Sequence, residues 1–189
     1  HAMSTVAHFS LPQYELMVEA GAFDGRLHHR VEFIRGEIRE MTPIGIGHAA
    51  VVDRLNRLSM ELLPADRAMV RIQGTLRAPA VESAPEPDVM WLRPKDYFQG
   101  HPEPEDVFLL IEVAESSLTM DTGEKAVLYA EAGIQDYWVV DVDEQSVEVF
   151  REPSPSGYQS RETHRAGAPV HSLAFPDVAL DPAQFFRFP

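Results

Sequence analysis

The alternation of apolar and polar residues divides the N-terminal part of the chain into three segments. Residues 12–20 predict a short helix, and residues 31–41 alternate on both sides of a turn at Gly36, which predicts a hairpin. Between residues 48 and 63 the apolar positions recur at the spacing of one helical face. The residues on that face are Val51, Leu55, Leu58 and Leu62. The pattern therefore predicts a helix, a hairpin and a second helix.

Strands dominate the rest of the pattern. The predicted strands are residues 69–77, 88–92, 107–114, 136–142 and 146–150. The strand at 107–114 is almost wholly apolar, which is typical of a central strand covered on both faces. A helix is predicted at 121–132, with Asp121 as N-cap and Glu124 as its capping-box partner. One or two further short strands and a brief helix complete the tail. This order of elements predicts an α/β fold with a mixed sheet.

Length and composition are those of one compact domain, expected to cover residues 3–189. The chain has 189 residues, of which 44% are hydrophobic and 24% charged. His1 and Ala2 precede Met3 and are interpreted as a cloning remnant. No apolar run approaches the roughly 18 residues of a membrane-spanning helix, and no signal peptide is recognisable. We therefore expect a cytoplasmic protein that does not contact membranes. The absence of cysteine excludes disulfides and zinc–thiolate sites.

The formal net charge of −14 argues against non-specific binding of nucleic acid, which depends on lysine and arginine neutralising phosphates. The charge is unevenly distributed. Residues 1–100 carry 11 basic and 13 acidic side chains, whereas residues 101–189 carry 5 and 17. A surface that binds nucleic acid is therefore expected in the N-terminal half. Arg54 and Arg57 lie one turn apart on the predicted helix at 48–63, away from its apolar face, and are the candidate residues for phosphate contact.

Glu112 is the most informative single residue. It is the only charge in its predicted strand, and a buried carboxylate without a partner costs several kcal/mol or must shift its pKa. A divalent cation would compensate it, since hard cations such as Mg²⁺ prefer oxygen ligands. The alternative is equally open at this point: Glu112 stands at an exposed strand end and pairs with an arginine.

Asp88 and Lys125 extend the candidate site. Asp88 opens a strand directly after Pro87, so its carboxylate could meet that of Glu112 at neighbouring strand ends. The alternative for Asp88 is ordinary turn chemistry. Lys125 is one of only two lysines and lies at the start of the next predicted helix, from where it could orient or deprotonate a water. The alternative for Lys125 is a surface pair with Asp121 at a spacing of four residues.

Three strings of sequence carry these residues: EPDVMWL, VFLLIEVAESS and MDTGEKAVLYAEAGIQDYWVVDVDEQSVEVF. Together they resemble the Uma-type family of restriction-endonuclease-like proteins, which belongs to the PD-(D/E)xK nuclease superfamily. The resemblance begins near Val31 and continues to the C-terminus. Its most specific positions are Pro87-Asp88, Glu112-Val113, Asp121 followed by Lys125, Tyr129, Gly133 and Tyr137-Trp138-x-x-Asp141.

The resemblance implies a fold and a chemistry. The fold would be a restriction-endonuclease-like mixed β-sheet flanked by helices, with an N-terminal helix and hairpin and a C-terminal β extension. The chemistry would be hydrolysis of DNA phosphodiester bonds by an endonuclease that depends on Mg²⁺ or Mn²⁺. Asp88, Glu112 and the backbone carbonyl of Val113 would hold the ion, and Lys125 would assist the attacking water.

Two further polar residues match recurrent positions of the family. Glu37 and His48 could add a metal ligand or contact the scissile phosphate. The alternatives are a carboxylate at the hairpin edge and a histidine at a helix start.

One departure from the superfamily pattern supports a second reading of the chain. The standard lysine stands two residues after the acidic residue of the strand, and here that position is Ala114. The resemblance implies that the lysine has moved to Lys125. The alternative function is a non-catalytic interaction or regulatory module that keeps the nuclease fold, and the negative charge favours it. For either function a homo-oligomer is expected, with a dimer favoured.

Overall fold

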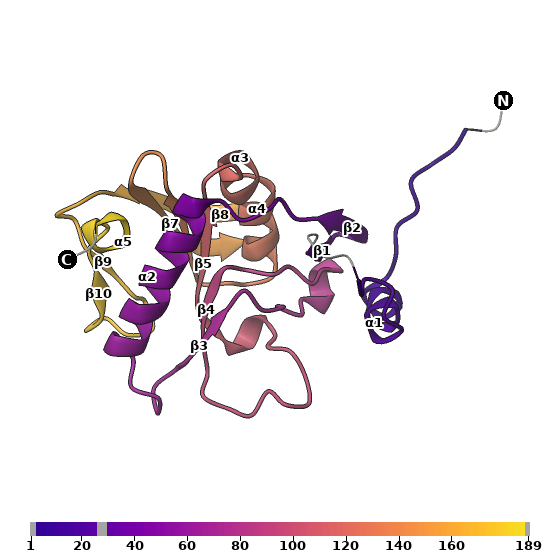
Figure 1. Ribbon diagram of the computed structural model, residues 1–189, viewed down its shortest axis with the longest axis horizontal. Coiled ribbons are helices and arrows are strands. Elements are labelled where there is room, and N and C mark those ends of the chain that lie inside the picture. The colour runs from indigo at the N-terminus through magenta and orange to yellow at the C-terminus, as the bar shows by residue number, and fades with distance from the viewer. Residues whose placement is uncertain (1–2, 26–29, 188–189) are drawn as a thin grey trace.

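The computed structural model describes residues 3–25 and 30–187, so the cloning remnant expected at residues 1–2 lies outside the described residues. Six strands form the main sheet (Figure 1). In order across the sheet they are β3 (Met69–Ile72), β4 (Val89–Leu92), β5 (Val107–Ala114), β6 (Asp136–Asp141), β7 (Ser146–Ser154) and β8 (Gly157–His164). Strands β5 and β6 are parallel, and the other neighbouring pairs are antiparallel. The predicted mixed sheet is confirmed.

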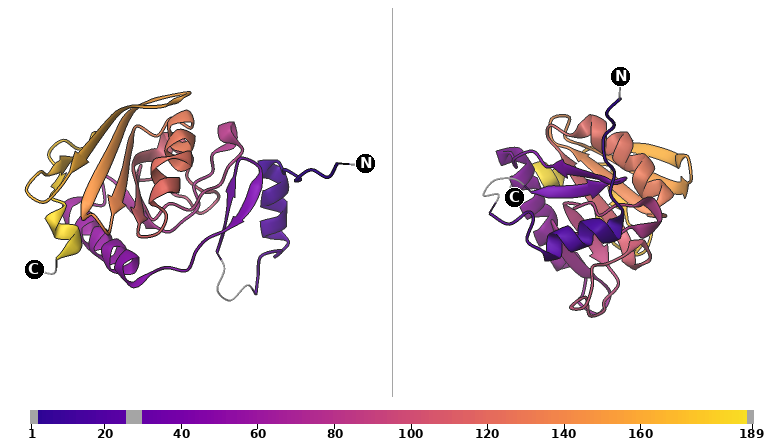
Figure 2. Two further views of the ribbon diagram at one scale, coloured as in Figure 1. Left: turned by 90° about the horizontal axis from the view of Figure 1, so that it is seen from above. Right: turned by 90° about the vertical axis from the view of Figure 1, so that its right-hand side faces the viewer.

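Helices cover both faces of this sheet (Figure 2). Helix α2 (Ile46–Leu62) lies on one face, and α3 (Leu118–Thr122) and α4 (Glu124–Glu131) lie on the other. Alternation along β5 sends Ile111 and Val113 into the core beneath α2, and Leu110 and Ala114 into the core beneath α4. Because Glu112 stands between Ile111 and Val113, its side chain points to the α4 face.

The N-terminal helix and hairpin are confirmed and form a separate small layer. They are α1 (Leu11–Glu19), β1 (Val31–Ile34) and β2 (Glu37–Glu40). Helix α1 begins with a capping box between Ser10 and Gln13, and Tyr14 stacks on Phe33 of β1 with ring centroids 4.6 Å apart. Figure 2 shows this layer at the end of the molecule opposite the C-terminus. The hairpin therefore lies next to the ends of the sheet strands that carry the candidate site residues Asp88 and Glu112.

The C-terminal segment returns to the α2 face. Its elements are β9 (Val170–His171), β10 (Ala179–Leu180) and α5 (Ala183–Phe186), and Leu180 and Phe185 join the core beneath α2. The two short strands β9 and β10 agree with the prediction for the tail. Strand β8 was not predicted, because its sequence GYQSRETH is largely polar and lacks an apolar period. Among the described residues no helix combines the length and apolar character needed to cross a membrane.

Two predicted elements were wrong in detail. The strand expected at 69–77 ends at Ile72, because Gln73 adopts a positive φ of 48° and its amide donates to the Asp88 carbonyl. The helix expected at 121–132 is two helices, since the backbone at Gly123 leaves helical geometry. Asp121 is therefore not an N-cap but a buried residue within α3. Two short 3₁₀ helices, η1 (Pro79–Val81) and η2 (Pro104–Asp106), lie on either side of β4 in the chain.

Candidate active site

Asp88 lies at the entrance to β4 and is 6% exposed. Its Oδ2 accepts a hydrogen bond of 2.8 Å from the amide of Val113 on β5, and its Oδ1 lies 3.0 Å from His48 Nε2. Burial raises the pKa of Asp88, but the hydrogen bond from His48 and the Val113 amide outweigh burial and leave the pKa lowered. Asp88 is therefore a buried, ionised carboxylate that joins two strands, rather than a solvated turn residue.

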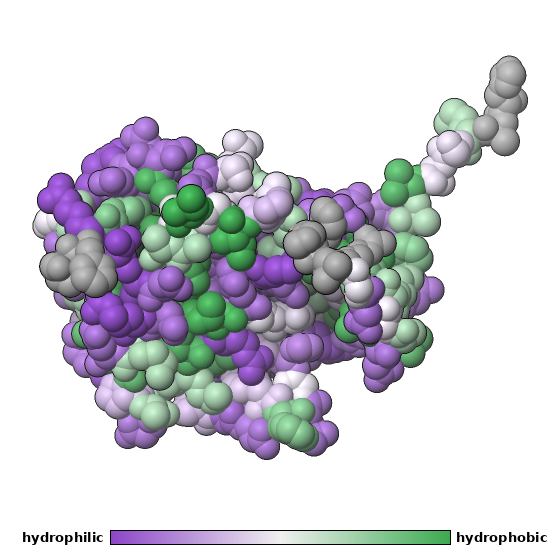
Figure 3. All heavy atoms as spheres, in the orientation of Figure 1, coloured by the Kyte–Doolittle hydropathy of each residue, from purple (hydrophilic) through white to green (hydrophobic). Residues whose placement is uncertain are grey.

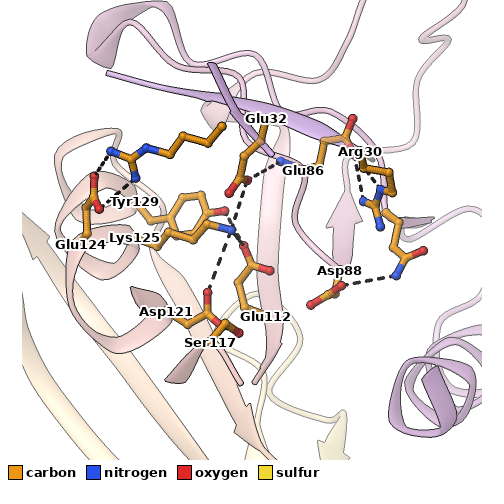
Figure 4. Close-up of polar contacts among 12 residues, drawn as sticks. Arg30, Glu32, Glu86, Asp88, Glu112, Ser117, Asp121, Glu124, Lys125 and Tyr129 are labelled. Atoms are coloured by element: carbon orange, nitrogen blue, oxygen red, sulfur yellow. Dashed lines mark hydrogen bonds and ion pairs between the residues drawn. The ribbon is translucent and has the colours of Figure 1, made fainter. Parts of the chain in front are cut away.

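Glu112 is 3% exposed on the α4 face of β5. Its Oε1 accepts hydrogen bonds from Lys125 Nζ at 3.1 Å and from the Tyr129 hydroxyl at 2.7 Å. In Figure 4 its other carboxylate oxygen is directed toward the side on which Asp88 lies. Burial raises the pKa of Glu112 well above its usual range. The alternative of an exposed strand end paired with arginine is wrong.

Lys125 is 5% exposed, so the alternative of a surface ion pair is also wrong. Its Nζ lies 3.1 Å from Glu112, 3.2 Å from Glu32 Oε2 and 4.0 Å from Asp121 Oδ1. Burial alone lowers the pKa of Lys125, but these surrounding carboxylates outweigh burial and raise it. The ammonium therefore stays protonated, and Figure 4 shows it between the carboxylates of Glu32, Glu112 and Asp121.

Three further residues of this network were not among the residues predicted to form the site. Glu32 is a buried acid on β1 whose ion pair with Lys125 connects the hairpin to the site. The Tyr129 hydroxyl on α4 donates a hydrogen bond to Glu112. Asp121 accepts a hydrogen bond from Ser117, and its burial raises its pKa to about 6. Glu32 was detectable, since it is the only charged residue in a buried four-residue strand, which is the signal that identified Glu112.

Apart from Tyr129, these residues line a cavity of about 760 Å³ between the hairpin and α3. Asp88, Glu112, Val113, Lys125 and His48 all contribute to its lining, so the structure brings five of the predicted residues together. The His48 ring belongs to the first turn of α2, and its buried Nδ1 has no hydrogen-bond partner in the part of the chain that is described. Burial lowers the pKa of His48, but the hydrogen bond to Asp88 and the negative charges of Asp88 and Glu115 together outweigh burial and raise the pKa overall.

Glu37 lies apart from this cavity. Its carboxylate accepts from Arg39 at 2.7 Å and lies 3.5 Å from His8 Nε2, and it is absent from the cavity lining. This position at the hairpin edge agrees with the alternative given above rather than with a ligand role.

Arg54 and Arg57 also lie away from the cavity lining. Arg54 donates to the Phe185 carbonyl at 3.2 Å, and Arg57 pairs with Glu61 one turn further along α2 at 3.1 Å. In each of these contacts the arginine donates through Nη1. Their role in nucleic-acid binding stays a prediction.

The donor chemistry of the cavity fits a hard divalent cation. Asp88 and Glu112 supply carboxylate oxygens on one wall, which are ligands that Mg²⁺ prefers. No group of three or more His, Cys, Asp or Glu side chains within residues 3–25 and 30–187 is arranged to hold a metal. A cation here would therefore have two protein carboxylates, and Mg²⁺ usually completes such a shell with water and substrate oxygens.

Comparison with known proteins identifies the family of this chain. Residues 19–183 match the family Uma2, described as "Putative restriction endonuclease". The chain belongs to the Uma2 family. The Uma2 protein is also similar to a solved structure, described as a putative nuclease belonging to DUF820 from Anabaena variabilis, with 17% sequence identity and a TM-score of 0.71. That similarity covers 94% of this chain and 97% of the other, and it shows the fold. No curated protein gives a significant match.

The resemblance deduced from sequence is confirmed by this membership, and so is the restriction-endonuclease-like α/β fold. The described residues also include the N-terminal helix and hairpin and the C-terminal strands that the resemblance implied.

Proposed function

We propose that this Uma2 protein is a metal-dependent endonuclease that hydrolyses phosphodiester bonds of DNA. The observation that carries the proposal is the pairing of two buried carboxylates, Asp88 and Glu112, on one cavity wall beside the buried ammonium of Lys125. Buried carboxylates are costly to a fold, and ionisable groups of this kind cluster at functional sites. The family description as a putative restriction endonuclease supports the same reaction class.

Asp88 and Glu112, with the Val113 carbonyl, would hold Mg²⁺ or Mn²⁺ at this wall. A divalent ion bound there would lower the pKa of its water and offset charge on the phosphoryl oxygens. The chain's own contribution is to fix the two carboxylates: the Val113 amide and His48 hold Asp88, and Tyr129 and Lys125 hold Glu112.

The contacts of Lys125 define its role in this proposal. An ammonium whose pKa is raised by Glu112, Glu32 and Asp121 cannot serve as a general base at neutral pH. Of the two roles considered from sequence, orienting or deprotonating a water, the proposal therefore drops deprotonation. It assigns Lys125 instead to offsetting charge and to orienting Glu112, to which its ammonium donates. Such electrostatic preorganisation acts in the transition state without reorganising at the moment of reaction.

A cleavage assay tests the proposal directly. Plasmid and oligonucleotide DNA are incubated with the protein in Mg²⁺, in Mn²⁺ and in excess chelator. Cleavage is expected in both metals and not in chelator, and Asp88→Asn should abolish it. Asp143→Asn, an exposed carboxylate in the β6–β7 turn, is the matched control and should cleave like wild type.

The alternative function is a non-catalytic interaction or regulatory module. The net charge of −14 and Ala114 in place of the strand lysine favour it. If this alternative holds, no substrate is cleaved and Mg²⁺ leaves the thermal midpoint unchanged. A nuclease of the proposed kind should instead be stabilised by Mg²⁺ through mass action on the native state.

Domain organisation, assembly and location stay predictions from sequence. We propose that residues 3–189 form one domain, that the protein is cytoplasmic, and that it assembles as a dimer. Light scattering during size exclusion would measure the assembly, with a dimer giving twice the 21.2 kDa mass of one chain.

A further inference from the structure

The proposed reaction would take place inside a cavity rather than on an open surface. Asp88 and Glu112 are 6% and 3% exposed, so a phosphate must enter the space of about 760 Å³ to reach them. Cavities of roughly 300–1,000 Å³ enclose small ligands. A nucleotide held in a duplex would have to leave its stack to enter, whereas an unpaired nucleotide is free to do so.

The walls near the cavity mouth carry apolar side chains from two elements. Met41, Pro43 and Ile44 line it from the loop between β2 and α2, and Met120 lines it from α3. Ile44 is 46% exposed and Met120 is 38% exposed. Figure 3 shows hydrophobic residues gathered near the N-terminal end of α2, next to this loop. A nucleic-acid base offers a flat apolar face that can pack against such side chains.

The charges of the cavity do not favour binding to a long run of backbone phosphates. Its lining includes seven carboxylates and three basic side chains. Lys125 is surrounded by carboxylates, Arg30 pairs with Glu86 at 2.8 Å, and Arg39 bonds to Glu124 as well as to Glu37. Duplex affinity usually depends on many free cations that release counterions, so recognition here must depend on other contacts.

We propose that the cavity selects an unpaired nucleotide, at a strand end, flap or loop, in preference to a base-paired one. The inference rests on the proposed nuclease function and names its substrate class. The base packs between Ile44 and Met120, and the adjoining phosphate reaches Asp88 and Glu112. The chemistry does not distinguish DNA from RNA, so both enter the experiment.

The test compares fluorescence anisotropy of labelled oligonucleotides in Ca²⁺ with cleavage of the same oligonucleotides in Mg²⁺. The probes are a single strand and a blunt duplex, each as DNA and RNA, and a DNA duplex with an unpaired flap. We expect the single strand and the flap to bind about tenfold or more tightly than the duplex. We also expect the single strand to make two or fewer phosphate contacts. The slope of log K for its binding against log salt concentration should therefore be no steeper than about −1.4.

Matched variants separate the cavity from the surrounding surface. Met120→Asp and Ile44→Asp should each weaken single-strand binding about tenfold. Leu118→Asp and Ile46→Asp are the controls, because each of these exposed residues stands two positions from a cavity residue but does not line the cavity. Neither control should change binding. Equal losses in the cavity variants and the controls would overturn the inference.

The remaining outcomes distinguish the inference from the function on which it rests. Tight binding of the blunt duplex would overturn the inference, and efficient cleavage of that duplex would overturn it while supporting a nuclease. Loss of that binding in the Arg54→Ala, Arg57→Ala double variant would place the contact on α2 instead. Selective single-strand binding without cleavage in Mg²⁺ or Mn²⁺ would support nucleotide selection and contradict the nuclease proposal. Binding of none of the probes would overturn both.

Discussion

The ammonium of Lys125 lies 3.1 Å from the Glu112 carboxylate, although the two residues are 13 positions apart and belong to different elements. Both side chains are almost fully buried. A buried ion pair of this kind is a poor source of net stability, but each partner becomes costly when the other is removed. The pair therefore links the candidate chemistry of the site to the stability of the fold.

Replacing Lys125 with methionine should destabilise the protein by about 3–5 kcal/mol, because buried carboxylates lose their counter-charge. Chemical denaturation at neutral pH would measure the loss. Lys95→Met is the control, since Lys95 is the other lysine and its exposed ammonium pairs with Asp106. That control should change stability little. Equal stability of Lys125→Met and wild type would contradict the buried position of this ammonium.

Lys125→Met should also abolish metal-dependent cleavage or slow it greatly, if the ammonium orients Glu112 and offsets transition-state charge. The assay is run at a temperature at which circular dichroism shows that the variant is folded. Lys125→Arg retains the charge and should retain more activity than the methionine variant. Cleavage by Lys125→Met at the wild-type rate would remove this residue from the active site.

Glu112→Gln should lose Mg²⁺ binding with little change in side-chain volume. The amide keeps the shape of the carboxylate but not the charge that a hard cation requires. Isothermal titration of wild type and variant with Mg²⁺ measures the affinity. Glu37→Gln is the control, because that carboxylate lies outside the cavity lining, and it should bind Mg²⁺ like wild type. Unchanged affinity in Glu112→Gln would exclude Glu112 as a ligand.

Tyr129→Phe should weaken Mg²⁺ binding although Tyr129 itself is no ligand. Its hydroxyl donates to Glu112 Oε1, and a hydrogen bond to a charged group contributes about 1.5–3 kcal/mol. Tyr137→Phe is the matched control, since that buried hydroxyl donates to the Asp121 carbonyl instead. Both variants should lose stability, and only Tyr129→Phe should lose metal affinity. Equal Mg²⁺ affinity in the two variants would assign Tyr129 a purely structural role.

Site residues on strands could be predicted from the sequence better than site residues on helices. An isolated acid in an apolar strand, such as Glu112, can be recognised from sequence because alternation and burial are local properties of the strand. Glu32 carries the same signal in a shorter strand. The contact between Glu32 and Lys125 could not be predicted, since it depends on how the hairpin packs against α4, which is a property of the tertiary structure.

The helical and surface errors have local physical causes. Asp121 and Glu124 have the spacing of a capping box, but a break at Gly123 places Asp121 inside a separate helix. The partner of Arg54 was also hidden from the sequence. Arg54 reaches a carbonyl of α5, far away in the chain, so its partner follows from packing of the two helices. Exposure of a helical face alone does not show that its cations are available.

The raised pKa of Asp121, about 6 instead of 3.8, predicts how stability changes with pH. A carboxyl group with a raised folded-state pKa stabilises the fold fully below about pH 4, and this contribution is lost as pH rises through about 6. The difference corresponds to on the order of 3 kcal/mol. Asp121→Asn carries no charge at any of these pH values, so its unfolding free energy relative to wild type should rise between pH 4 and 7. Urea denaturation of both proteins across this range measures the difference, and a difference that stays constant would show that Asp121 titrates normally.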